Sequence, residues 1–231
     1  MIKAYVFDLD GTLHDQEISE REALEKLFRE DVRLEPTPSF SAFLRAWRNA
    51  AEEYLSSSPK GGLSFEAKRR GRVMDSYSQF GVELGPEEAG LLFQKYSSHY
   101  EKSWRPYAEA VPALEALKPS VRLGVITNGD GPMQRGKIKA CGLDGFFESV
   151  IVSGEAGCAK PDAAIFELSR NAFGLAPEEM AYVGDRLETD ALAAKAAGWQ
   201  GIWINRKQMP GIESDPSIRV IQSLLELKAG P

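Results

Sequence analysis

Short apolar segments that stop abruptly at polar residues recur along this chain, and they constrain its fold more than any other feature. The first covers residues 2–7 and stops at Asp8, and the next covers residues 121–126 and stops at Thr127. Three more follow, at residues 149–152, 181–183 and 201–204. Helical stretches follow the middle three segments, at residues 132–141, 162–173 and 188–197, and each is ended by a glycine. Short continuous strands alternating with helices are typical of a parallel sheet covered on both faces, so the sequence predicts an α/β fold.

The region between the first two apolar segments has a different pattern. Residues 17–101 show no strand pattern and contain four helical stretches, at residues 19–31, 39–56, 64–80 and 86–101. In the second stretch an apolar face recurs at helical spacing, formed by Phe40, Phe43, Leu44, Trp47 and Ala51. We therefore expect an α/β core made of residues 1–16 and 104–231, interrupted after its first strand by an all-helical domain of residues 17–103.

Charge and cysteine content argue against several classes of protein. The chain has 34 acidic and 28 basic residues and a net charge of −6, whereas nucleic-acid-binding domains are usually strongly basic. Its two cysteines, Cys141 and Cys158, are too few for a disulfide-stapled secreted fold. The apolar N-terminal run ends at Asp8, far short of a signal peptide or membrane span. We expect a cytoplasmic protein, monomeric or homodimeric, with neither nucleic acid nor membrane as a partner.

Polar and charged residues follow the predicted strands at the points where the strands end. In an open parallel sheet, ligands bind beyond these carboxyl ends. The residues found there are Asp8, Asp10, Thr127, Asn128, Lys160, Asp185 and Asp190. Crowded carboxylates need a cation to stay ionised together, and oxygen ligands without His or Cys favour Mg²⁺ over zinc. A lysine and a threonine at the same edge suit an anion, and the combination indicates phosphoryl transfer.

Four segments of the chain resemble, in order, the four sequence motifs of the haloacid dehalogenase superfamily. They are Asp8-Leu9-Asp10-Gly11-Thr12, Ile126-Thr127-Asn128, Lys160-Pro161 and Gly184-Asp185-Arg186-Leu187-Glu188-Thr189-Asp190. The resemblance covers the predicted α/β part, about two thirds of the chain. It implies a Rossmann-like parallel-sheet core with a helical cap inserted after the first strand. It also implies a Mg²⁺-dependent phosphatase that acts on a small phosphorylated substrate.

The resemblance further implies catalytic and phosphate-binding roles for the matching residues. Asp8 would be the nucleophile that attacks phosphorus and forms an aspartyl phosphate. Asp10 would be the general acid and base, first protonating the leaving alkoxide and then activating water. Thr127 and the Asn128 N–H would bind the phosphoryl oxygens, while Lys160 would stabilise the charge on Asp8 and on the phosphoryl group.

A metal site is implied in the same way. Asp8, Asp185 and the backbone carbonyl of Asp10 would bind Mg²⁺, while Asp190 and Glu188 would act on the ion through water or through its direct ligands. Family members that break carbon–halogen bonds use no magnesium and lack an acid at the position of Asp10. The presence of both Asp10 and Asp185 therefore favours phosphatase over dehalogenase chemistry.

Two other functions remain as alternatives at this stage. A phosphomutase would use the same Asp8 chemistry but return the phosphoryl group to another hydroxyl while the closed cap excludes water. A receiver-type signalling module also gathers acids, a threonine and a lysine around Mg²⁺ without being an enzyme. Such a module carries adjacent acids after its first strand and no helical insert, whereas this chain has Asp8-x-Asp10 and a long insert.

The sequence says less about the substrate. Thr127-Asn128-Gly129 with Gln134 and Lys137 is similar to the family branch that acts on nucleotides and acylneuraminate phosphates, so nucleotide and sugar phosphates are the leading group. In the insert, the basic run at residues 68–72 and Trp47 are candidate substrate contacts, although a solvated helix face and a domain core are their commoner roles. His14 follows the first motif, and we expect it to be an exposed loop histidine.

Overall fold

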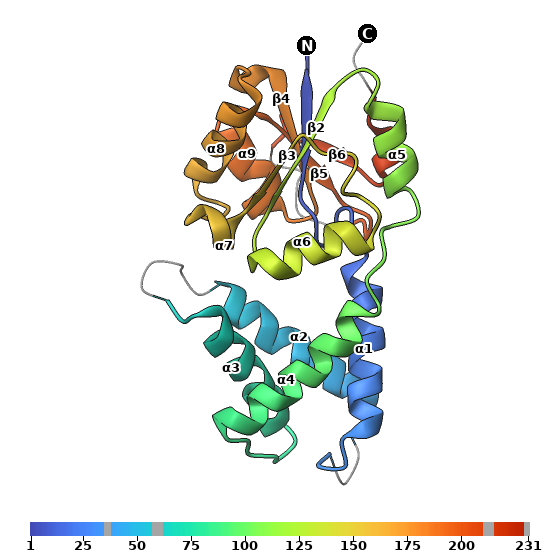
Figure 1. Cartoon of the computed structure of the whole chain (residues 1–231), viewed down its shortest axis with the longest axis vertical. Coiled ribbons are helices and arrows are strands. Elements are labelled where there is room, and N and C mark those ends of the chain that lie inside the picture. The colour runs from blue at the N-terminus through green and yellow to red at the C-terminus, as the bar shows by residue number, and fades with distance from the viewer. Residues whose placement is uncertain (35–37, 57–61, 210–214, 229–231) are drawn as a thin grey trace. The chain divides into compact units, whose positions relative to one another are not determined.

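The computed structural model describes residues 1–34, 38–56, 62–209 and 215–228 (Figure 1). The chain divides into two compact units, one formed by Met1–Gln16 with Arg105–Pro231 and the other by Glu17–Trp104. The first unit contains the sheet and the second is helical. Among the described residues, no helix is both long enough and apolar enough to span a membrane.

The first unit is built on a six-stranded sheet in which every strand pairing is parallel. The strands lie in the order β3-β2-β1-β4-β5-β6. Their bounds are β1 (Ala4–Phe7), β2 (Arg122–Thr127), β3 (Ser149–Val152), β4 (Met180–Gly184), β5 (Gln200–Ile204) and β6 (Arg219–Ile221). The predicted α/β class and the first five strands are confirmed. Because β1 lies between β2 and β4, the residues that follow these three strands emerge side by side at one edge of the sheet.

The sixth strand was not predicted. β6 has only three residues, Arg219–Ile221, and Val220 in its middle is exposed. It lies at the edge of the sheet and pairs only with β5. A short edge strand of this kind lacks the continuous apolar run by which the buried strands are recognised.

Helices connect the strands of the first unit. They are α5 (Ala110–Leu117), α6 (Gly131–Ala140), α7 (Ser153–Ala156), α8 (Ala163–Phe173) and α9 (Ala193–Ala196). In Figure 1, α8 and α9 lie on one side of the sheet and α5 on the other. The helix predicted at residues 188–197 begins instead with a π-helical turn at Leu187–Leu192 and only then continues as α9. Turns of this wider type are rare and often lie at functional sites, and this one carries Asp190.

The described residues of the second unit form four helices: α1 (Gln16–Glu30), α2 (Phe40–Ser56), α3 (Phe65–Ser78) and α4 (Pro86–Glu101). Their apolar faces form a core in which Phe43 and Trp47 of α2 and Tyr77 of α3 are fully enclosed. Trp47 is therefore a core residue, as its helical spacing favours. Ser64 caps α3 by accepting a hydrogen bond from the Ala67 N–H at 3.1 Å, which explains where that helix begins.

A buried ion-pair network joins three helices of this unit. The Glu20 carboxylate of α1 accepts hydrogen bonds from Arg48 of α2 at 2.8 Å and from Arg72 of α3 at 2.6 Å. The Arg72 guanidinium also lies over the Trp47 ring, 4.5 Å from its centroid. The expectation that the basic run at residues 68–72 forms a solvated face is therefore wrong for Arg72, which is half-buried and paired with an acidic residue of another helix.

We expect Glu20→Ala to destabilise the helical unit by about 1–3 kcal/mol, because two guanidinium groups lose a buried acceptor. Urea unfolding followed by far-UV circular dichroism would measure the change in the free energy of unfolding. Glu25→Ala is the matched control on the same helix, since Glu25 pairs with Arg29 on the exposed surface and should change stability little. Equal losses in the two variants would contradict the assignment of the Glu20 network to the core.

Candidate active site

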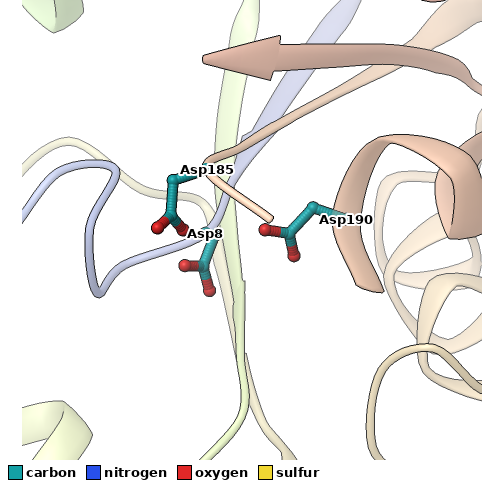
Figure 2. Close-up of side chains that lie close together, drawn as sticks. All are labelled: Asp8, Asp185 and Asp190. Carbon is teal, nitrogen blue, oxygen red and sulfur yellow. The ribbon is translucent and has the colours of Figure 1, made fainter. Parts of the chain in front are cut away.

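Three carboxylates meet at the edge of the sheet where β1 and β4 end. Asp8 follows β1, Asp185 follows β4, and Asp190 lies in the π-helical turn that comes next. Figure 2 shows the three side chains turned toward one another, and one oxygen from each lies within 4.8 Å of the others. The neighbouring positions of β1 and β4 produce this cluster, because the Asp8 N–H donates to the Val183 carbonyl at 2.8 Å. The expected convergence of Asp8, Asp185 and Asp190 is therefore present in the structure.

Lys160 lies inside this group and uses all three of its N–H bonds. Its Nζ donates to Asp8 Oδ1 at 2.7 Å, to Asp190 Oδ1 at 2.6 Å and to the Tyr182 hydroxyl at 2.7 Å. Burial on its own lowers the pKa of Lys160, but the Asp190 and Asp8 carboxylates more than offset it, so the pKa lies above its ordinary value. The ammonium is therefore a fixed positive charge against Asp8.

Tyr182 is a site residue that the sequence analysis missed. It belongs to β4 and reads there as one more residue of a buried apolar strand. Its hydroxyl accepts from Lys160 and donates to the Ile126 carbonyl at 2.7 Å, so it ties the lysine to β2. A tyrosine within a fully buried strand was the available signal, because a buried hydroxyl needs a hydrogen-bond partner.

Asp185 provides the test of whether a cation fits here. Its Oδ1 is buried and has no hydrogen-bond partner among the described residues. Burial raises the pKa of Asp8 and of Asp185, and the Asp190 carboxylate raises both further, against the opposing effect of Lys160. Crowded, desolvated carboxylates with an orphaned oxygen are the environment that a hard divalent cation stabilises. The oxygen-only donor set therefore fits Mg²⁺.

The backbone at Gly11 and the contacts of Asp190 determine which oxygens of the cluster can reach an ion. Gly11 has φ +81°, and a Cβ at this position would lie 2.3 Å from Asp185 Oδ2, so only glycine permits the close approach of the loop after β1. Asp190 already has both oxygens engaged, since Oδ1 accepts from Lys160 and Oδ2 accepts from the Arg186 N–H at 2.9 Å. Asp8 and Asp185 are therefore the side chains of the cluster best able to contact an ion directly.

The Asp10 side chain lies apart from the three-carboxylate cluster. It accepts hydrogen bonds from His14 Nδ1 at 2.7 Å, from Gln134 Nε2 at 2.9 Å and from Lys137 Nζ at 2.7 and 2.8 Å. Burial would raise the pKa of this carboxyl, yet Lys137 and His14 hold it well below its ordinary value. The expectation of an exposed His14 is wrong, because its ring is fully enclosed and contacts Asp10.

Of the remaining predicted residues, Thr127 and Asn128 contact other residues of the site, whereas Glu188 does not belong to the acidic cluster. Thr127 is buried and its Oγ1 accepts from Gln134 Nε2 at 2.6 Å. The Asn128 side chain pairs with the backbone of Lys160, donating to its carbonyl at 2.8 Å and accepting from its N–H at 2.9 Å. Thr127 is thus linked to Asp10 through Gln134, and Asn128 fixes the loop that carries Lys160. Glu188 is exposed and is not one of the three clustered acids.

Arg206, which follows β5, holds the loop after β1 from the other side. Its guanidinium donates to the carbonyls of Gly11 at 2.7 Å and Thr12 at 2.9 Å and to Glu109 at 2.8 Å. It also stacks on Tyr107, 3.7 Å from the ring centroid. The turn that follows Asp10 is thus clamped by residues that sequence motifs alone did not indicate.

Comparison with known proteins agrees with this geometry. A profile of the haloacid dehalogenase-like hydrolase family matches residues 2–198. Glyceraldehyde 3-phosphate phosphatase of Methanopyrus kandleri is 30% identical over 216 residues, which cover 92% of this chain and 88% of that protein. Phosphoserine phosphatase of Thermus thermophilus is 41% identical over 116 residues, which are 50% of this chain and 46% of that protein. The latter match thus spans about half of each chain.

Solved structures share the fold. The putative HAD-hydrolase YfnB from Bacillus subtilis superposes with a TM-score of 0.82 at 22% identity, covering 98% of this chain and 99% of that one. Structures of 2-haloacid dehalogenases are similar as well, so the fold alone does not separate the two chemistries. The family match over most of the chain nevertheless places it: this protein belongs to the haloacid dehalogenase-like hydrolases.

Proposed function

We propose that this protein is a Mg²⁺-dependent phosphatase that hydrolyses a small phosphomonoester through an aspartyl phosphate on Asp8. The observation that carries the proposal is the arrangement of Asp8, Asp185 and Lys160. A carboxylate held by a buried ammonium lies beside a second carboxylate with an orphaned oxygen. A nucleophile, an anion-stabilising charge and a cation-binding oxygen are the groups that phosphoryl transfer requires.

The metal site of the proposal consists of Asp8, Asp185 and the backbone carbonyl of Asp10. Bound there, Mg²⁺ would neutralise charge on the phosphoryl oxygens and on the two carboxylates. Asp190 keeps Lys160 in place and is not needed as a direct ligand, because both its oxygens are engaged by protein donors. Glu188, which is exposed, would act only through water.

The reaction proceeds in two displacements. Lys160 holds Asp8 Oδ1, which makes Oδ2 the candidate attacking atom. In the first displacement Oδ2 bonds to phosphorus, the bond from phosphorus to the ester oxygen breaks, and the protonated form of Asp10 transfers its proton to the departing alkoxide. The ionised form, which Lys137 and His14 favour, then acts as the base. In the second, Asp10 takes a proton from water, the hydroxide bonds to phosphorus, and the bond to Asp8 breaks to release inorganic phosphate. Thr127 and the Asn128 N–H bind the phosphoryl oxygens in both steps.

The substrate class follows from the relatives and from the donor set. The two relatives described above are named for glyceraldehyde 3-phosphate and phosphoserine, which are small alkyl phosphates. Alkoxides are poor leaving groups, so their departure requires a general acid, and we assign that role to Asp10. Dehalogenation would require neither this acid nor the cation-binding oxygen of Asp185. We therefore favour small alkyl phosphates, including sugar phosphates, as substrates.

A panel of phosphomonoesters tests the proposal, with released inorganic phosphate as the measurement. We expect release from at least one alkyl phosphate in the presence of Mg²⁺. EDTA should abolish it and excess Mg²⁺ restore it, because the clustered carboxylates depend on a hard cation. Recovery with Zn²⁺ but not Mg²⁺ would contradict the proposed site. Isomerisation of a sugar phosphate without phosphate release would identify a mutase instead.

A further inference from the structure

The Asp10 carboxylate is enclosed by four hydrogen bonds from three buried side chains. Lys137 donates to both of its oxygens, at 2.8 and 2.7 Å, while His14 donates to Oδ1 and Gln134 to Oδ2. Lys137 is 3% exposed, Gln134 2% and His14 0%. A lysine is almost never this buried unless it is paired, and Asp10 is its partner. We name Lys137, Gln134 and His14 the Asp10 cradle.

Two of the three cradle residues, Gln134 and Lys137, lie on α6, which begins just after β2 ends. Gln134 and Lys137 are three residues apart and therefore lie on the same face of this helix. In Figure 1, α6 lies across the edge of the sheet at which β1 and β2 end. Gly129, with φ +151°, leaves room for Gln134, since a Cβ there would lie 2.9 Å from its Cγ. Local backbone structure thus directs both side chains toward Asp10.

Gln134 connects Asp10 to the phosphate-binding threonine. Its Nε2 lies 2.9 Å from Asp10 Oδ2 and 2.6 Å from Thr127 Oγ1, so one amide group contacts both side chains. The position of the acid relative to the phosphoryl group is therefore set by α6 as well as by the loop that carries Asp10. A general acid must reach the leaving oxygen within hydrogen-bond distance, and small displacements reduce its effect strongly.

We infer that Lys137 is a positioning residue, which together with Gln134 and His14 fixes the direction of the Asp10 side chain, so that its carboxyl group, when protonated, reaches the leaving group. The inference rests on the proposed function, since it assigns a role toward the acid of that reaction. Lys137 acts through Asp10 and not on the phosphoryl group, because its ammonium is buried and chelates the Asp10 carboxylate. Loss of Lys137 should therefore slow the reaction most for substrates whose leaving group cannot depart without a proton.

Two substrates with the same phosphoryl group but different leaving groups test this directly. For Lys137→Met, we expect kcat with the best alkyl phosphate of the panel to fall about 10²-fold with little change in KM. Single-turnover release of p-nitrophenolate from p-nitrophenyl phosphate should fall by less than about tenfold, because that leaving group departs without protonation. Lys139→Met is the matched control, since Lys139 lies exposed on the same helix, and it should behave like the wild type.

A double-mutant cycle with Asp10→Asn separates positioning from a general structural role. In the Asp10→Asn background, Lys137→Met should change single turnover of the alkyl phosphate by less than about twofold, because the residue through which it acts is already lost. This pair also leaves no buried carboxylate without a partner, so it keeps the test available if Lys137→Met alone folds poorly. Lys137→Arg, which retains two donors to a carboxylate, should restore part of the activity.

The outcomes are distinguishable. If the wild type is active but Lys137→Met lowers the rates with aryl and alkyl phosphates equally, the inference is overturned and the phosphatase proposal stands. The same conclusion follows if Lys137→Met lowers the rate of the Asp10→Asn enzyme as much as it lowers that of the wild type. A wild type that releases phosphate from no substrate of the panel overturns the proposed function, and the inference with it. A loss of rate confined to alkyl phosphates, together with non-additive effects of Lys137→Met and Asp10→Asn, supports the inference and the phosphatase proposal.

Discussion

An Asp8→Asn variant is expected to lose phosphate release by about 10⁴-fold or more, because the amide cannot attack phosphorus and no aspartyl phosphate forms. The substitution preserves the shape of the side chain, so the fold should persist. Asp8 Oδ1 accepts from Lys160, and an amide oxygen can still accept that hydrogen bond. The measurement is inorganic phosphate released from the best alkyl phosphate at saturating Mg²⁺.

Trapping the phosphoenzyme makes the Asp8 prediction sharper. Acid quenching during turnover, followed by peptide mass spectrometry, should place one phosphoryl group on the peptide that contains Asp8 in the wild type and none in the variant. Asp144→Asn is a suitable control, since Asp144 is exposed and distant in sequence from the motifs. Retention of wild-type turnover by Asp8→Asn would remove Asp8 from the role of nucleophile.

The second large effect is expected for Lys160→Met. Its ammonium bridges two buried carboxylates, at 2.7 Å from Asp8 and 2.6 Å from Asp190, and both would lose their charged partner. Breaking a buried pair by removing one partner costs about 3–5 kcal/mol, and losing one charge that stabilises the transition state costs about 10²–10³-fold in kcat. Urea unfolding and phosphate release would measure the two effects separately.

Two comparisons test the explanation of the Lys160 effect. Adding Asp190→Asn to Lys160→Met should recover part of the lost stability, because one of the uncompensated buried charges is then removed. Lys195→Met is the control, since Lys195 pairs with Asp215 on the exposed surface and should change neither stability nor activity appreciably. A Lys160→Met variant as stable as the wild type would show that the buried ammonium does not hold this cluster together.

Much of the site could be predicted because a parallel sheet brings strand ends together. Asp8 and Asp185 follow β1 and β4, and Thr127 is the last residue of the neighbouring β2, so their arrival at one edge of the sheet depends only on strand order and on the polar residue at each end. Lys160 was predicted from its position after the third strand as well as from the resemblance, and it does lie against Asp8. Periodicity likewise predicted α2 of the insert, because its apolar residues recur at a spacing that a strand cannot reproduce.

The partners of these residues could not be predicted. Tyr182 and Lys137 contact the site through side-chain directions, which depend on the packing of a strand and a helix and leave no mark in the sequence pattern. The sequence predicts an exposed His14, because nothing in its own segment shows that Asp10 accepts a hydrogen bond from it. The π-helical turn that carries Asp190 and the three-residue strand β6 were missed for a related reason, since both are too short to show a period.

The position of β1 within the sheet affects the order in which the chain can fold during synthesis. β1 is the first strand to leave the ribosome, yet its two neighbours are β2, which begins at Arg122, and β4, which begins at Met180. The whole of Glu17–Trp104, with its own apolar core, is translated in between. The helical unit can therefore pack while β1 still waits unpaired, and the sheet must close over a long stretch of chain, a step of high contact order that slows folding.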